Sequence, residues 1–531
     1  MSMPELSSAD HSQSPPLVHI PRLYNAAHDL IERNLRAGRG GKAAYIDDQG
    51  VYSYDELARR AARFANGLRA LGLEPEERIV LCMHDTIDLP TAFLGAILAG
   101  IVPIPVNTLL TPGDYEYMLD DSRACLAVIS APLQPAIQPL LDRLPLLRRV
   151  IVAGAAADDR HSMAHLLASA PGMDSVAATT SDDVCFWLYS SGSTGRPKGT
   201  VHIHSSLIHT AELYARPFIG ISEADVVFSV PKLFFAYGLG NSLTFPLAVG
   251  ATAVLMAERP TPAATFARLL ARRPTIFYGV PTLYAAMLAS PELPRPEALR
   301  LRRCVSAGEP LPEDIGKRWS RHFGVDILDG IGSTEMLHIF LSNSAAQLRY
   351  GTTGKPVPGY DVRLVDDDGR PVGPGEQGEL QVAGPSSAVM YWNNREKSRQ
   401  TFLGYWTRTG DKFQETADGY YVYAGRSDDM LKVSGIYVSP AEVEAALITH
   451  PAVLETAVVG RPDEDGLTKP LACVVLRPGI TGSQDLAAEL KQHVKALLAP
   501  YKYPRWIEFL GELPKTATGK IQRFRLRERA R

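Results

Sequence analysis

One ten-residue segment, Ser190-Ser-Gly-Ser-Thr-Gly-Arg-Pro-Lys-Gly199, concentrates residues that can hold an anion. Its three glycines let the backbone approach a ligand closely, and its four hydroxyls and two cations supply donors and positive charge. The segment therefore predicts a phosphate site. The candidate contacts are Ser190, Ser191, Gly192, Ser193, Thr194, Gly195 and Lys198. The alternative is an ordinary surface turn; the P-loop pattern GxxxxGK[ST] does not fit, because glycine follows the lysine.

Two further polar segments could do chemistry with phosphate. Gly332-Ser-Thr-Glu335 places a carboxylate beside hydroxyls, a combination that suits Mg²⁺ on phosphate oxygens. Its alternative is a helix N-cap box. Pro514-Lys-Thr-Ala-Thr-Gly-Lys520 ends in a lysine within a Gly-containing polar loop, where the alternative is a solvated tail lysine.

The elements that must position these segments follow from the hydrophobic pattern. Val184–Tyr189, directly before the phosphate segment, is predicted to be a buried strand. The other strands expected in this part are Ile79–Met83, Val102–Val106, Val150–Ala153, Val226–Val230, Ala251–Met256, Thr275–Val280, Arg303–Ala307 and Val325–Leu328. The expected helices are one from the capping box Ser53–Glu56 to Gly72, Asp88–Leu98, Pro262–Leu270 and Thr282–Leu288. Strands that alternate with helices predict an α/β domain of stacked, mostly parallel sheets.

The pattern changes after about residue 355. Short alternating segments between Gly- and Pro-rich turns predict a small antiparallel β subdomain over about 355–427. Beyond it, helices at Pro440–Leu447 and Leu486–Leu498 and strands at Leu454–Val459 and Leu471–Leu476 predict a small α+β domain, followed by a polar tail. We expect an N-terminal domain over 21–427 and a C-terminal domain over 428–531.

Composition sets further bounds. The 531 residues need at least two domains, and a formal charge of −3 gives no basic excess for nucleic acid. Residues 1–20 begin with a polar, Pro/Ser-rich stretch and are expected to be a disordered lead-in. The most apolar stretch, 94–106, is broken by prolines and too short to span a bilayer, so a cytoplasmic location without membrane contact is expected. Five scattered cysteines fit reduced thiols, and His202, His204 and His209 lack partners at metal spacing.

These motifs, in this order, resemble the adenylate-forming superfamily of acyl- and aryl-CoA ligases over roughly residues 25–525. The resemblance implies activation of a carboxylic acid by ATP to an acyl-adenylate, release of pyrophosphate and transfer to coenzyme A. It makes Lys520 the catalytic lysine that bridges the acid oxygen and the α-phosphate. It gives Thr334 a phosphate contact and Glu335 the Mg²⁺.

The resemblance also places the nucleoside of ATP. Asp411 matches the aspartate that holds the ribose diol, and Arg426 matches a second ribose or phosphate contact. Ala307, Gly308 and Glu309 resemble one wall of the adenine pocket, and Asp329, Gly330, Ile331 and Gly332 the other. Ile331 departs from the family, in which many members carry an aromatic residue there, so adenine stacking at that position is in question.

Two orientations of the C-terminal domain are expected from the family. Asp428 sits at the family's hinge position, where a residue absorbs the φ/ψ change of a mobile domain. In one orientation Lys520 faces the site. In the other, Lys432, Ser434 and Gly435 would line the channel for the thiol arm of coenzyme A.

The acid pocket matches the family motif Lys232-Leu-Phe-Phe-Ala-Tyr-Gly238. Its candidate residues are Phe235, Ala236, Tyr237, Gly238, His338 and Ile339. Phe235 stands where amino-acid-activating relatives carry an aspartate, so an amino acid is disfavoured, and bulky rings suit a flat aromatic acid. The alternatives are a core aromatic pair and a core histidine.

The combination resembles benzoate–CoA ligases and the related hydroxybenzoate enzymes. Four other functions stay open at this point: a ligase for substituted benzoates, a ligase for short or medium aliphatic acids, a standalone module that loads a carrier protein, and a non-catalytic nucleotide-binding relative. Whether the chain forms a homodimer is also open.

Overall fold

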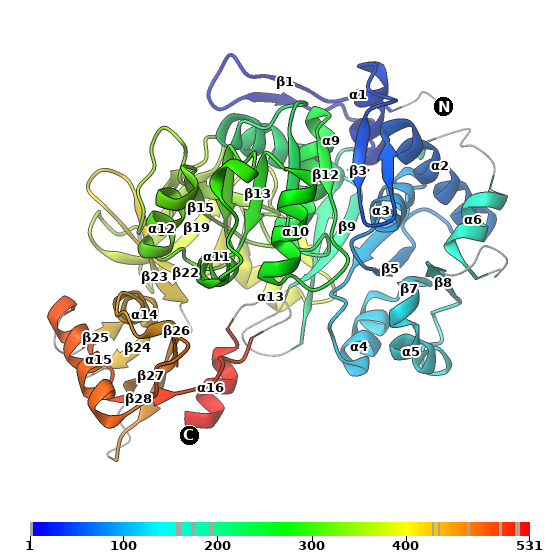
Figure 1. The fold of residues 1–531 in the computed structure, drawn as a ribbon. Helices are drawn as coiled ribbons and strands as arrows, with labels where there is room; N and C mark the ends of the chain where they lie inside the picture. Colours follow the sequence, from blue (N-terminus) through cyan, green and yellow to red (C-terminus); the bar gives the residue numbers. More distant parts are fainter. Residues whose placement is uncertain are drawn as a thin grey trace.

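The computed structural model describes residues 4–154, 161–170, 176–190, 196–426, 429–433, 436–464, 468–498, 502–515 and 521–530. Figure 1 shows a large body, coloured blue to yellow, and a smaller orange and red body formed by the C-terminal part of the chain. Helices and strands alternate through the large body, which confirms the predicted α/β class. Among the described helices, none combines the length and apolar character needed to cross a bilayer.

A nine-stranded sheet lies at the centre of the large body, in the order β17-β16-β15-β14-β13-β11-β12-β3-β4. Its strands are β3 (Ala43–Ile46), β4 (Val51–Ser53), β11 (Val226–Ser229), β12 (Thr252–Val254), β13 (Ile276–Gly279), β14 (Arg303–Ser306), β15 (Ile327–Gly332), β16 (Ile339–Ser342) and β17 (Lys355–Pro356). From β15 to β3 in this order, neighbouring strands are parallel. The antiparallel strands β16 and β17 close one edge, and the antiparallel strand β4 closes the other. The parallel strands are nearly continuous apolar runs because both faces of the sheet are covered.

Alternate residues of these strands enter two separate cores. Phe228 and Phe277 pack with Trp319 beneath the helices α10 (Pro262–Arg272), α11 (Pro281–Ala289) and α12 (Glu313–Phe323). Val227 and Tyr278 point to the opposite face and join the largest core. That face is covered by α1 (Ala26–Arg36), α7 (His204–Thr210), η3 (Ala211–Ile219), α8 (Ala236–Leu239), η4 (Gly240–Thr244) and α9 (Phe245–Val249).

A second sheet, β6-β5-β7-β8, is parallel throughout. Its strands are β5 (Arg78–Cys82), β6 (Val102–Pro105), β7 (Leu126–Ser130) and β8 (Arg149–Ala153), accompanied by α2 (Tyr54–Ala70), α3 (Asp88–Leu98), α4 (Pro112–Ser122), α5 (Gln134–Ile137) and α6 (Met163–Ser169). The predicted N-cap of α2 at Ser53 is confirmed, since the Ser53 Oγ accepts a 3.2 Å hydrogen bond from the Glu56 backbone N–H. Helix α3 has the predicted bounds.

Two antiparallel sheets complete the large body. The first contains β9 (Val184–Ser190), β10 (Lys198–Ile203) and β20 (Met390–Tyr391). The second contains β18 (Asp361–Val365), β19 (Gln377–Ala383), β21 (Phe402–Leu403), β22 (Trp406–Glu415) and β23 (Tyr421–Arg426), with α13 (Arg395–Thr401) before β21. The antiparallel pairing of the second sheet agrees with the pattern expected after residue 355.

The smaller body has its own cores. It contains β24 (Leu431–Val433), β25 (Ile436–Val438), α14 (Pro440–Ile448), β26 (Val453–Pro462), β27 (Thr468–Leu476), α15 (Gln484–Leu497), β28 (Trp506–Phe509) and α16 (Arg523–Ala530). The prediction of a polar tail after Leu498 is wrong for the described residues. There β28 pairs with β27, and α16 buries Leu526 and Ala530. Arg523 on α16 donates to both oxygens of Glu444 on α14.

The N-terminal segment differs from the prediction for residues 1–20. Its described part forms an antiparallel hairpin of β1 (Ser8–Asp10) and β2 (Leu17–His19), not a disordered lead-in. Polar contacts with the large body replace the apolar burial that the segment lacks: the Ser7 Oγ donates to Asp29 at 2.6 Å, and a ring nitrogen of His11 lies 2.6 Å from Glu212. Figure 1 shows this hairpin across one end of the large body.

Candidate active site

The described ends of the predicted phosphate segment belong to two paired strands. Strands β9 and β10 are antiparallel, and Ser190 pairs with Lys198. Ser191, Gly192, Ser193, Thr194 and Gly195 lie outside the described residues. The Lys198 ammonium stands 4.4 Å from the ring centroid of Tyr391 on the neighbouring β20. Burial lowers the pKa of Lys198, while the Glu335 carboxylate acts in the opposite direction.

Glu335 lies beside this hairpin on the turn between β15 and β16. Its Oε1 accepts a 2.7 Å hydrogen bond from the Tyr391 hydroxyl and a 3.4 Å hydrogen bond from the Ser190 Oγ. Burial raises the pKa of Tyr391, so that hydroxyl stays protonated and donates. The turn connects two strands and starts no helix, which removes the N-cap alternative for Ser333 and Thr334.

A buried histidine fixes the backbone of the same turn. The His202 Nε2 lies 2.8 Å from the Thr334 carbonyl oxygen, and its ring stacks on Phe186 at 5.3 Å. Burial lowers the pKa of His202 to about 4, so the ring is neutral near pH 7. Because a carbonyl oxygen only accepts, the Nε2 must carry the proton. His202 therefore positions Thr334, a role that its sequence pattern did not reveal.

The two predicted walls of the adenine pocket are neighbours in the central sheet. Ala307, Gly308 and Glu309 follow β14, and Asp329, Gly330, Ile331 and Gly332 belong to β15, which runs past its predicted end at Leu328. Ser306 is paired with Asp329 across these strands. Gly308 has a φ of +93°, which an L side chain rarely adopts. A Cβ on Gly332 would lie 2.4 Å from the His338 carbonyl oxygen, so glycine is required there.

Asp329 is a buried carboxyl at this edge of the sheet. Burial raises its pKa to about 8, and the few hydrogen bonds available to it do not compensate. The carboxyl is therefore mostly protonated at neutral pH. A neutral acid beside the predicted adenine wall can donate a hydrogen bond as well as accept one.

Asp411 and Arg426 face each other across β22 and β23. The Arg426 guanidinium lies 3.2 Å from the Asp411 Oδ1 and also donates to the Thr409 carbonyl oxygen at 3.3 Å. Asp411 is only 8% exposed, so its carboxylate has a fixed direction. The structure thus brings together the two residues that the resemblance assigns to ribose.

The predicted acid-pocket residues lie on two segments that meet. Tyr237 on α8 and His338, just before β16, have ring centroids 5.5 Å apart. Ala236 and Gly238 belong to the same helix, Phe235 precedes it, and Ile339 is buried at the start of β16. The ring of Phe235 packs edge-on against Phe234 at 4.5 Å, and among the described residues no ring pair joins it to Tyr237 or His338.

Residues that the acid-pocket motif did not single out also surround His338. Tyr214 and Phe245 lie 5.5 and 4.4 Å from its ring, and its Nε2 lies 3.2 Å from the Asn241 Oδ1. Burial lowers the pKa of His338 to about 3, so the ring is uncharged. These partners come from η3, η4 and α9, so only the folded chain could reveal them.

A buried carboxylate anchors the start of the acid-pocket segment. Both oxygens of Asp85, which follows β5, lie 3.2–3.3 Å from the Leu233 backbone N–H. Burial raises the pKa of Asp85 to about 6, although the Lys232 ammonium attracts its negative form. Lys232 donates to the carbonyl oxygens of Met256 and Glu258, so both ends of this anchor are fixed.

The remaining predicted residues belong to the C-terminal part. Lys520, Asp428, Ser434 and Gly435 lie outside the described residues. The backbone of Lys432 is in β24. The predictions for these five residues rest on the motifs alone.

The large α/β body and the small C-terminal body have the arrangement of adenylate-forming CoA ligases, among which the structural neighbours of this chain are found. The chain belongs to the AMP-binding enzyme family, whose model matches residues 31–392, and the model of that family's C-terminal domain matches residues 442–520. The predicted membership of the adenylate-forming superfamily is therefore confirmed.

The chain is 66% identical to the benzoate–CoA ligase of Thauera aromatica over 98% of its own length and 99% of that protein. A solved benzoate CoA ligase from Burkholderia xenovorans LB400 is 57% identical, with a TM-score of 0.90 over 95% of this chain and 100% of that one. The anthranilate CoA ligase AuaEII, solved with anthranoyl-AMP, is 43% identical, with a TM-score of 0.93 over 96% and 98% of the two chains.

Proposed function

We propose that this enzyme joins benzoate to coenzyme A at the expense of ATP. A benzoate oxygen attacks the α-phosphorus, the bond to pyrophosphate breaks, and benzoyl-AMP forms. The thiol of coenzyme A then attacks the benzoyl carbonyl, AMP leaves with the former carboxylate oxygen, and the thiol proton passes to solvent. The similarity to two benzoate–CoA ligases supports this substrate and acceptor.

One observation carries the proposal: Glu335 and His338 are on the same short turn. The hairpin of β9 and β10 meets this turn at Glu335, where Ser190 of β9 and Tyr391 of the neighbouring β20 contact the carboxylate. Tyr237 meets it at His338. Only Met336 and Leu337 therefore separate the phosphate side of the turn from the predicted acid pocket, so an acid bound near His338 would lie close to the triphosphate.

The pocket favours a flat, uncharged ring. Tyr237, Tyr214 and Phe245 surround a neutral His338. Phe235 occupies the position at which an amino-acid substrate would need a carboxylate partner, and a buried ammonium without one is strongly disfavoured. An unsubstituted aromatic carboxylate satisfies these surroundings better than an amino acid.

The oxygen ligands at Glu335 fit Mg²⁺. Both hydroxyls contact Oε1, and among the described residues no hydrogen bond uses Oε2, which would be the atom to bind a cation. A single carboxylate together with substrate phosphates is a common arrangement for this ion. When bound, Mg²⁺ neutralises charge on the triphosphate. Thr334 is held by His202 for a phosphate contact, and Lys198 serves the pyrophosphate side.

We assign the other predicted residues by their place in the reaction. Lys520 would stabilise the negative charge that develops between the carboxylate and the α-phosphate. Asp411 and Arg426 would hold the ribose. Asp428 would be the hinge between domains 21–427 and 428–531, and Lys432, Ser434 and Gly435 would line the thiol channel. ATP and coenzyme A as substrates, with five buried free cysteines, support a cytoplasmic enzyme.

A panel of carboxylates assayed for pyrophosphate and AMP release, with and without coenzyme A, tests this function. Benzoate should give the highest kcat/KM, with one benzoyl-CoA and one AMP per turnover. Faster turnover of hexanoate would overturn the aromatic assignment. Adenylation completed only by an acyl-carrier protein would overturn coenzyme A as the acceptor.

A further inference from the structure

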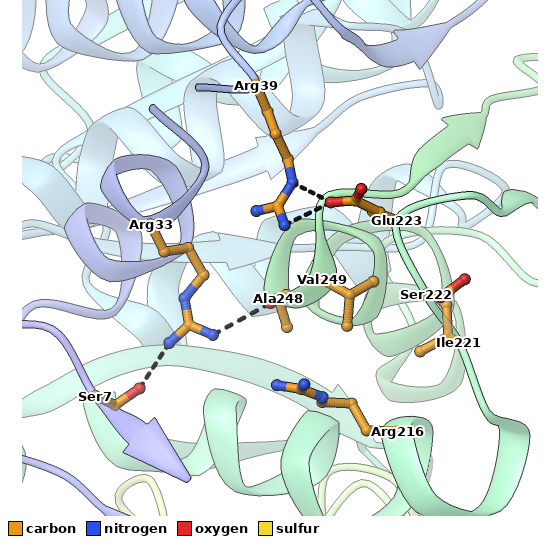
Figure 2. Close-up of a pocket in the computed structure, with 9 residues that line it drawn as sticks. All are labelled: Ser7, Arg33, Arg39, Arg216, Ile221, Ser222, Glu223, Ala248 and Val249. Carbon is orange, nitrogen blue, oxygen red and sulfur yellow. Dashed lines mark hydrogen bonds and ion pairs between the residues drawn. The ribbon is translucent and has the colours of Figure 1, made fainter. Parts of the chain in front are cut away.

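A cavity of about 460 Å³ lies outside the residues assigned to catalysis. Its walls come from the N-terminal hairpin segment, α1, η3, α9 and the loop after η3 (Figure 2). Small-molecule sites commonly have volumes of about 300–1,000 Å³. We call this cavity the arginine pocket, because Arg33, Arg39 and Arg216 line it.

Each of the three guanidinium groups is held by a carboxylate. Arg33 donates to Asp29 at 2.8 Å, Arg39 lies 2.6 Å from Glu223, and Arg216 lies 3.3 Å from Glu212. The arginine side chains are 15%, 26% and 42% exposed, respectively. The carboxylates fix the directions of the cations, so a ligand need not order three flexible side chains.

Arg216 has the donors that a ligand could use. Its hydrogen bonds to Glu212 involve one terminal nitrogen, at 3.3 and 3.4 Å. Within the described part of the chain, its Nε and second terminal nitrogen make no hydrogen bond. Figure 2 shows the Arg216 guanidinium extending toward Arg33 and Ser7 beneath Ala248. A planar guanidinium with two N–H groups free matches a carboxylate, which can accept two parallel hydrogen bonds.

The charges and the apolar wall narrow the class of ligand. Asp29, Glu212 and Glu223 pair with the three arginines, and the Lys42 ammonium adds one positive charge beside Glu223, so the pocket suits a monoanion better than a polyphosphate. Ile221, Ala248 and Val249 form an apolar wall near Arg216. We propose that the arginine pocket is a second binding site for a small organic monocarboxylate, with its carboxylate on Arg216 and its apolar part against that wall.

The pocket adjoins the helix that also lines the acid site. Segment η3 carries Glu212 and Arg216 toward the arginine pocket and Tyr214 toward His338. Ligand binding at the two sites must therefore be measured separately. Filling the active site with a non-hydrolysable acyl-sulfamoyl adenosine, a mimic of the adenylate, leaves the arginine pocket as the site to be titrated.

Isothermal titration calorimetry tests the proposal. Sodium benzoate is titrated into the full-length protein, whose active site is already saturated with that mimic. We expect one benzoate to bind per chain. In Arg216→Ala the affinity should fall by about tenfold or more, because one charge-assisted contact is lost. Val249→Trp, which fills the cavity without removing a charge, should also abolish binding. Arg370→Ala is the matched control, since the Arg370 side chain is 75% exposed and its ion pair is with Asp368 in a surface turn.

Three outcomes would overturn the proposal: no second benzoate in the wild type, equal affinity in Arg216→Ala and the wild type, or binding of inorganic phosphate in preference to benzoate. Thermal unfolding of each variant verifies that it is folded. Pyrophosphate release is measured in parallel, so a failed second site is distinguished from a failed benzoate ligase, whose turnover does not require this pocket.

Discussion

Two replacements of Asp85 separate the contribution of its hydrogen bond from the contribution of its buried charge. Asp85 is 3% exposed and accepts the Leu233 N–H, which begins the segment that carries Tyr237. Asp85→Asn keeps an oxygen that can accept this hydrogen bond but removes the charge. Asp85→Ala removes both and leaves a buried N–H unpaired, at a cost of about 1–3 kcal/mol. We therefore expect the alanine variant to be clearly less stable than the asparagine variant.

The pH dependence follows from the pKa of Asp85. Its pKa is about 6 in the folded protein, against 3.8 for a free side chain, because burial disfavours the charged form. The folded state thus binds the proton more tightly, and the contribution of Asp85 to the free energy of unfolding rises as the pH falls from 7 toward 4. Between pH 7 and pH 5 this gain is about 1.3 kcal/mol, at 1.36 kcal/mol for each pKa unit. Asp85→Asn has no such gain.

Urea unfolding of the wild type and both variants at pH 7 and pH 5 measures these differences. The free energy of unfolding of the wild type relative to Asp85→Asn should rise by about 1.3 kcal/mol on going to pH 5. Asp85→Ala should also raise the KM for benzoate while leaving the KM for ATP unchanged, because only the acid-pocket segment loses its anchor. Equal stability of the two variants, or no change between the two pH values, would refute this reasoning.

Three further substitutions test the assigned roles. Lys520→Ala should cut benzoyl-AMP formation by about 100-fold or more at an unchanged Tm; activity within threefold of the wild type would remove its catalytic role. Asp411→Asn should raise the KM for ATP by about tenfold, because the ribose loses a charged acceptor; an unchanged KM would count against ribose binding. Asp428→Pro should slow thioester formation more than adenylation in single-turnover assays, and equal slowing would argue against a hinge.

Local patterns predicted much of the fold. Helix α3 follows its apolar run from Asp88 to Leu98, and the Ser53 cap starts α2 as expected. The parallel strands were recognisable because burial on both faces requires continuous apolar residues. The N-terminal hairpin was missed because polar contacts with distant residues, such as that between His11 and Glu212, stabilise a segment with few apolar side chains.

The candidate site was predicted where its residues form motifs and missed where they meet only in the folded chain. Glu335 and Tyr237 are in short, recognisable segments. Tyr391, which donates to Glu335, is 56 residues away from it in the sequence, and His202 is 132 residues away from Thr334. Asp85 and Leu233 are 148 residues apart. No local spacing encodes such pairs, because the sheet order brings them together.

The central claim is that the acid attacks the α-phosphate directly, at the turn between Glu335 and His338. Benzoate labelled with ¹⁸O in both carboxylate oxygens, turned over with ATP and coenzyme A, tests it by mass spectrometry of the products. We predict one ¹⁸O atom in each AMP, one in each benzoyl-CoA and none in pyrophosphate. Unlabelled AMP, or label in pyrophosphate, would contradict an acyl-adenylate intermediate.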